Sequence, residues 1–168
     1  MRYALVAMAV VLAAGLPGCA QQPSGDPSLA TAADWYELFG PRTCEVSYFT
    51  EFSDFNGDGA TDGLTVFVGL ADRFGDPVKA VGRFRIETFQ YLGHAVDKRG
   101  VQLSNWVVNV FAAEDVRRYY DNISRGFRFP LQFATGVEGD RLIVQVTYYL
   151  PDDSGRKLFS QRVVKAEK

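Results

Sequence analysis

The chain has 168 residues, and its 18 Lys or Arg and 20 Asp or Glu leave a net charge of −2. This near balance argues against the basic patch with which nucleic-acid-binding proteins hold phosphates, so we expect no nucleic-acid partner. The length suits one domain that buries enough surface to fold without metal or disulfide support.

An uncharged run of 14 residues, rich in Ala, Val and Leu, extends from Tyr3 to Leu16 and follows the positive charge of Arg2. A membrane span needs about 20 apolar residues, so this run is too short to cross comfortably. Its length is typical of the apolar region of a secretory signal, and small residues follow it. The pattern predicts a signal peptide over residues 1–18.

The segment Leu16-Pro17-Gly18-Cys19 resembles the lipobox of bacterial lipoproteins, although Pro17 stands where that family has a small or β-branched residue. The resemblance implies that Cys19 is lipidated and becomes the first mature residue. Ala20 in place of Asp implies anchoring in the outer membrane. Two alternatives remain: cleavage after Ala20 to give a secreted or periplasmic protein, and a retained membrane helix.

Residues 20–31 are dominated by Pro, Ser, Gly and Gln without apolar periodicity, which is typical of a tether. We therefore predict lipidated Cys19 and a tether over residues 19–31, attaching one domain over residues 32–168 to the membrane. A lipidated Cys19 would leave Cys44 without a disulfide partner. We interpret Cys44 as a small buried side chain on the first strand.

Apolar and polar residues alternate along most of the domain, as they do in half-buried strands. The alternation predicts seven strands, within Val46–Phe52, Leu64–Leu70, Arg83–Glu87, Trp106–Val110, Phe127–Phe133, Arg141–Leu150 and Lys157–Lys165. Pro130 cannot donate to a ladder, so its strand is expected at a sheet edge. Seven short antiparallel strands predict a mainly β fold, a β-sandwich.

Two short helices are expected to interrupt the strands. One covers Ala32–Phe39, and the other covers Ala112–Tyr120, where Glu114 is spaced to pair with Arg117 and Arg118. The segment from Ala71 to Gly82 resembles the turn between strands in bacterial immunoglobulin-like and transthyretin-like domains. That resemblance implies an immunoglobulin-like sandwich rather than a barrel.

The segment from Asp54 to Gly63 has the spacing of a calcium loop. Its first, third, fifth and ninth positions are Asp54, Asn56, Asp58 and Asp62, and Ala60 at the seventh position could add its carbonyl oxygen. Glycine at the sixth position allows the sharp turn that such a loop needs. The spacing predicts one structural Ca²⁺, and the alternative is a solvated turn between two strands.

Thr65 occupies the twelfth position, where an EF-hand has Glu, and strand patterns flank the loop. The segment is similar to the calcium-loaded hairpin loops of integrin-type propeller (FG-GAP) repeats. Only one copy is present, whereas a propeller needs several, so the resemblance extends to the loop and not to the fold.

No catalytic set is recognisable in the sequence. His94 is the only histidine, which excludes a site with two or three His ligands to zinc. No nucleophile elbow, phosphate loop or dinucleotide fingerprint occurs. Glu114 and Asp115 are read as a solvated helix face rather than as glycosidase carboxylates.

The aromatic residues divide into two groups. Trp106 and the stripe of Phe127, Phe129 and Phe133 alternate with polar residues, which predicts core positions. Tyr119 and Tyr120, beside Arg117 and Arg118, are expected to form an exposed contact cluster. The sequence favours a non-catalytic binding or structural module with a protein or glycan partner. The alternatives are an envelope hydrolase using carboxylates and a scaffold subunit of an envelope assembly.

Overall fold

The computed structural model describes residues 32–134, 139–152 and 154–166, so the predicted signal peptide, Cys19 and the tether lie outside the described residues. The helices are α1 (Ala32–Phe39) and α2 (Ala113–Tyr119). The strands are β1 (Thr43–Val46), β2 (Glu51–Ser53), β3 (Gly63–Ala71), β4 (Gly82–Tyr91), β5 (Arg99–Val110), β6 (Tyr120–Asp121), β7 (Gly126–Gln132), β8 (Arg141–Tyr149) and β9 (Lys157–Lys165).

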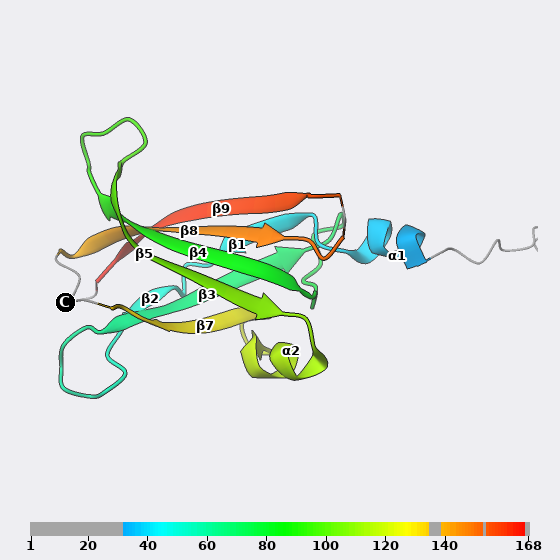
Figure 1. Cartoon of the computed structure of the whole chain (residues 1–168), viewed down its shortest axis with the longest axis horizontal. Coiled ribbons are helices and arrows are strands. Elements are labelled where there is room, and N and C mark those ends of the chain that lie inside the picture. Colours follow the sequence, from blue (N-terminus) through cyan, green and yellow to red (C-terminus); the bar gives the residue numbers. More distant parts are fainter. Residues whose placement is uncertain (1–31, 135–138, 153, 167–168) are drawn as a thin grey trace, which may run out of the picture. The chain divides into compact units, whose positions relative to one another are not determined.

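The strands form two antiparallel sheets that pack face to face (Figure 1). Sheet A has the order β1-β3-β7-β6, and β2 pairs with the first residues of β3, beyond the end of β1. Sheet B has the order β5-β4-β8-β9. The fold is therefore mainly β, a two-sheet sandwich, and both helices are where the sequence predicts them. The described residues form nine strands rather than the predicted seven.

One extra strand arises because the first predicted strand is divided in two. The alternation from Val46 to Phe52 predicts one strand, but residues 47–50 make a turn in which the Thr50 N–H donates to the Ser47 carbonyl at 3.1 Å. The Thr50 hydroxyl accepts the Phe67 N–H at 3.0 Å, and the Ser47 N–H donates to the Phe67 carbonyl at 2.8 Å. β3 thus holds this turn by its own backbone, and the turn separates β1 from β2.

The other extra strand, β6, has two residues and pairs only with Gly126 and Phe127 of β7. Beyond this pairing β7 has a strand neighbour on one side only within the described part of the chain, and Pro130 lies in that half. Pro130 therefore stands at a sheet edge, as predicted, because its missing N–H costs no ladder bond there.

The core lies between the sheets, where alternate side chains of the central strands meet. Phe84 of β4 lies 5.0 and 4.9 Å from the rings of Phe127 and Phe129 and 4.9 Å from Tyr148, and none of these four side chains is exposed. Burial of each ring contributes about 1.5–3 kcal/mol. Trp106 and Phe133 are half-buried against this core.

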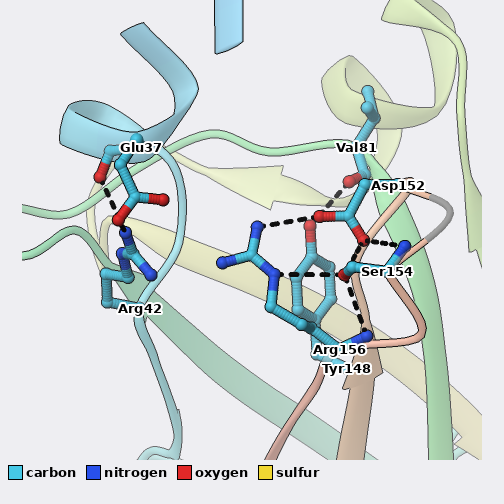
Figure 2. A network of polar contacts seen from close by, with 7 residues as sticks. All are labelled: Glu37, Arg42, Val81, Tyr148, Asp152, Ser154 and Arg156. Carbon is cyan, nitrogen blue, oxygen red and sulfur yellow. Dashed lines mark hydrogen bonds and ion pairs between the residues drawn. The ribbon is translucent and has the colours of Figure 1, made fainter. Parts of the chain in front are cut away.

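Helix α1 is fixed to one end of the sandwich. Tyr36 packs on the core and Glu37 forms an ion pair with Arg42 just beyond the helix (Figure 2). Nearby, the buried Tyr148 hydroxyl donates to the Val81 carbonyl at 2.6 Å, and Arg156 bonds Asp152 at 2.8 Å in the β8–β9 loop (Figure 2). The acidic loop between β2 and β3 lies at the opposite end (Figure 1).

Candidate binding face and acidic loop

The outer surface of sheet A is hollowed around Phe67, which lines three separate hollows. Phe67 lies in the middle of β3, and its neighbours Val66 and Val68 are fully buried. Because side chains alternate across a strand, the Phe67 ring points away from the core. We call this surface the Phe67 face; it comprises Tyr48, Phe49, Glu51, Phe67, Gly69, Arg118, Tyr120, Ile123 and Arg128.

The turn between β1 and β2 forms one wall of the Phe67 face. The ring centres of Tyr48 and Phe49 lie 4.1 Å apart, and Phe49 meets Phe67 edge-on at 6.1 Å. Tyr48 is 71% exposed and Phe49 47% exposed, although the turn that carries them is bonded to β3. Exposed aromatic rings on a fixed backbone bind a partner at low cost in conformational entropy.

The opposite wall is formed by the end of α2, by β6 and by the turn that follows. It encloses a hollow of about 510 Å³ whose lining includes Glu51, Arg118, Tyr120 and Arg128. Charges of both signs therefore surround the Phe67 ring. Arginine and tyrosine are enriched at the energetic centres of protein interfaces.

Asp121 also lines this hollow, but its carboxylate is engaged in the turn. It accepts the N–H groups of Ile123 and Ser124, each at 3.1 Å. The neighbouring Ser124 side chain and the bonds from these two N–H groups hold the pKa of Asp121 below its usual value. An ionised carboxylate with these bonds stabilises the turn and is a poor general acid.

A smaller hollow of about 180 Å³ lies between Tyr48, Phe67 and Gly69. A Cβ atom at Gly69 would meet no atom nearer than the Glu45 carbonyl oxygen, at 4.0 Å. The glycine is therefore not required for close packing. Its missing side chain leaves the hollow open.

The predicted cluster of Tyr119, Tyr120, Arg117 and Arg118 is only partly exposed. Both tyrosines are half-buried, with ring centres 5.3 Å from Phe129 and Phe127, respectively. The prediction that these rings are exposed is therefore wrong, since α2 and β6 cover the core. Arg118 does reach the Phe67 face, whereas Arg117 bonds Glu114 at 2.7 Å, as its spacing predicted.

The acidic loop folds so that its side chains bind its own backbone. Asp54 accepts the N–H groups of Gly57 and Gly59, each at 2.7 Å, and these bonds hold the pKa of Asp54 below its usual value. Asn56 accepts the N–H of Asp58 at 2.9 Å. The two glycines have φ of 78° and 85°, a left-handed conformation that favours glycine.

The other predicted ligands continue this pattern. Asp58 accepts the N–H of Ala60 at 2.8 Å, and Asp62 accepts the N–H of Phe55 at 2.9 Å, which ties the two ends of the loop together. The donor chemistry fits a hard cation, because a carboxylate retains lone pairs beyond the bonds it accepts here. Within the described residues, no three His, Cys, Asp or Glu side chains gather as a metal-binding group.

Of three other residues that the sequence singles out, Cys44 lies where it is predicted, buried on the first strand. Cys44 is a buried free thiol on β1, and burial, with a smaller contribution from the charge of Glu45, raises its pKa to about 12. His94 is exposed in the β4–β5 turn. Asp115 accepts the N–H groups of Phe111 and Ala112 at the start of α2, so its role is structural and it is not part of a solvated helix face.

The outer face of sheet B carries a polar network that is not evident in the sequence. Its centre is Glu87, 7% exposed, which accepts bonds from Arg85 at 2.8 Å, Gln102 at 3.2 Å and Gln145 at 3.1 Å. The register of three strands brings these residues together. Their spacing in the sequence does not indicate that they are neighbours. The carboxylate is satisfied on both oxygens, which indicates a structural role.

Neither helix in the described part of the chain has the length and apolar character needed to cross a membrane. Comparison of the chain with protein-family models, with curated proteins and with solved structures gave no match.

Proposed function

We propose that this chain is an envelope lipoprotein, anchored through lipidated Cys19, whose sandwich binds a protein partner without catalysing a reaction. The signal-like run and the lipobox-like segment before Cys19 support the anchor. The proposed site of anchoring is the outer membrane. An immunoglobulin-like type of sandwich is part of the proposal, on the resemblance of the turn between Ala71 and Gly82.

The observation that carries the binding function is the Phe67 face. It combines fixed, exposed aromatic rings with arginines and carboxylates around open hollows. A protein partner fits this mixture better than a glycan, because Tyr and Arg anchors beside apolar side chains such as Ile123, 94% exposed, are typical of protein interfaces.

The lipid anchor is tested by identifying the first residue of the mature protein and its modification. Mass spectrometry of protein from native membranes should find lipid on Cys19 and no residue before it, and Cys19→Ala should release the protein from membranes. An unmodified N-terminus at Gln21 would contradict lipidation and favour the secreted or periplasmic alternative.

The binding face is tested by site-specific photo-crosslinking in native cells. A photoreactive residue in place of Tyr48 or Ile123 should give one discrete adduct, which protease but not glycosidase digests. The same residue in place of Phe159, an exposed position on β9, is the matched control and should give none. Equal adducts from all three positions would contradict a specific face, and a glycosidase-sensitive adduct would favour a glycan.

A second variant separates binding from stability. Gly69→Thr fills the smaller hollow with a side chain that suits a strand, so the free energy of unfolding should be maintained. In the Gly69→Thr variant, the yield of crosslinked adduct from a photoreactive residue at position 48 should nevertheless fall strongly. Undiminished crosslinking would show that the hollow is not part of the interface.

The proposed calcium site is structural. Asp54, Asn56, Asp58 and Asp62 would supply side-chain oxygens and Ala60 its carbonyl, and the cation would offset the repulsion among three carboxylates. The loop lies at the end of the sandwich opposite α1 (Figure 1), so calcium would order that end of the domain.

A further inference from the structure

The end of the sandwich that carries α1 exposes three aromatic rings in one cluster. Trp35 and Phe39 are one helical turn apart on α1 and stack with ring centres 5.5 Å apart. Phe74, in the turn between β3 and β4, lies 6.1 Å from Phe39. Their exposed fractions are 55%, 48% and 63%, and we call these three residues the α1 patch. Gathered, exposed rings of this kind mark an interaction surface.

An apolar hollow extends the patch between α1 and the start of β4. It has a volume of about 540 Å³, and Trp35, Phe39 and Val81 are among its lining residues. Val81 is itself 37% exposed. Lys79 also lines the hollow, and its other lining residues make a surface that extends from the helix to the end of sheet B where β4 begins.

The rings are held by fixed elements on both sides. Tyr36, between the two exposed rings of α1 in sequence, packs on the core, and the Glu37–Arg42 pair ties the helix to the following segment (Figure 2). The turn that carries Phe74 is closed by buried Asp72, which accepts the N–H groups of Phe74 at 2.8 Å and Asp76 at 3.0 Å. The outward position of the rings is thus built into the fold.

We propose that the α1 patch lies against the lipid bilayer in which Cys19 is anchored, an inference that rests on the lipoprotein function proposed above. Only residues 20–31 separate Cys19 from α1, and a chain of that length spans at most about 45 Å. Because α1 is the first element after the anchor, the tether keeps this end of the domain within reach of the membrane. Trp and Phe rings favour the boundary between headgroups and acyl chains.

The charges around the patch indicate what kind of bilayer is needed. Glu37 is paired with Arg42, and the Arg73 guanidinium lies 5.8 Å from the Phe74 ring, while Asp76 adds a negative charge nearby. Both signs are present, so contact depends on burial of apolar rings rather than on anionic lipid. A bilayer of zwitterionic phosphatidylcholine, which has no net charge, should therefore suffice for this contact.

The test uses the full lipidated protein in phosphatidylcholine vesicles that carry bromine high on the acyl chains. Bromine quenches tryptophan only on close approach, so most of the Trp35 emission should be lost. Trp35→Phe isolates the remaining tryptophan, Trp106, which should be hardly quenched. Phe74→Asp should weaken the quenching of Trp35, whereas Val96→Asp, a fully exposed position in the β4–β5 turn, should not.

Flotation of the vesicles separates this inference from the anchor. If the protein floats with the vesicles but Trp35 is not quenched, the α1 patch does not contact the bilayer. The lipid anchor is not contradicted by that result. Protein that does not float overturns both. Unquenched Trp35 together with crosslinking between two copies through α1 would show that a second molecule, and not lipid, covers the patch.

Discussion

At the scale of single residues, Cys44 shows how burial controls the reactivity of a side chain. The thiol lies on β1 at 9% exposure, and burial followed by the charge of Glu45 raises its pKa from 9.0 to about 12. The reactive thiolate is therefore suppressed in the folded protein. The side chain acts as a small apolar group, as its position in the alternating pattern predicted.

This raised pKa predicts a loss of stability at alkaline pH. The unfolded chain ionises its thiol first, so the contribution of Cys44 is fully present below about pH 9 and is lost as the pH rises towards 12. By pH 10 the free energy of unfolding should fall by about 1.4 kcal/mol through this group. Urea unfolding at pH 8 and pH 10 measures it, and Cys44→Ala should show a smaller loss. If the wild type and Cys44→Ala lose the same unfolding free energy between pH 8 and pH 10, other titratable groups cause the loss.

At the scale of elements, turns carry most of the candidate functional features. The turn of residues 47–50 presents Tyr48 and Phe49, and the turn after β3 presents Phe74. The sequence predicted both helices, and for α2 the local spacing of Glu114 and Arg117 supplied the signal. It missed the 47–50 turn, because Val46, Tyr48, Thr50 and Phe52 alternate without interruption and only the bonds to Phe67 bend the chain there.

The acidic loop between β2 and β3 is expected to make the melting temperature depend on calcium. If it binds Ca²⁺ in the folded state alone, millimolar calcium should raise the melting temperature by about 3–6 °C, and magnesium should raise it less. Asp58→Ala should abolish the shift, whereas Asp97→Ala, an exposed acidic residue in another loop, should retain it. Identical melting curves in calcium and in chelator would show that the loop is a solvated acidic turn.

At the scale of the whole molecule, the two sheets are linked along one side by side chains rather than by a shared ladder. The Val46 N–H of β1 donates to the Ser160 hydroxyl of β9 at 3.0 Å, and Arg162 of β9 donates to the Val46 carbonyl at 2.8 Å. The backbone N–H and carbonyl of Val46 are thereby satisfied without another strand, which also helps to protect this end of the sheet A edge from pairing with other chains.

Removing this link should destabilise the sandwich. Ser160→Ala leaves the partly buried Val46 N–H without its partner, which should cost about 1–2 kcal/mol of unfolding free energy. Gln161→Ala, on the outer face of the same strand, should change stability by less than about 0.5 kcal/mol. Denaturant unfolding of the two variants provides the comparison, and equal effects would mean that the link contributes little.

The sequence by itself determined the local features of this protein. Period-two alternation identified the strand segments from Leu64 onward except the two-residue β6, and it assigned Phe127 and Phe129 to the core, because a strand exposes its two faces alternately. Only the tertiary structure decided which strands are neighbours, and hence that Phe67, Tyr48 and Arg118 share one face and that Trp35, Phe39 and Phe74 share another. Alternation marks which side of a strand is apolar but carries no information on its partner, its register or the turn that folds over it.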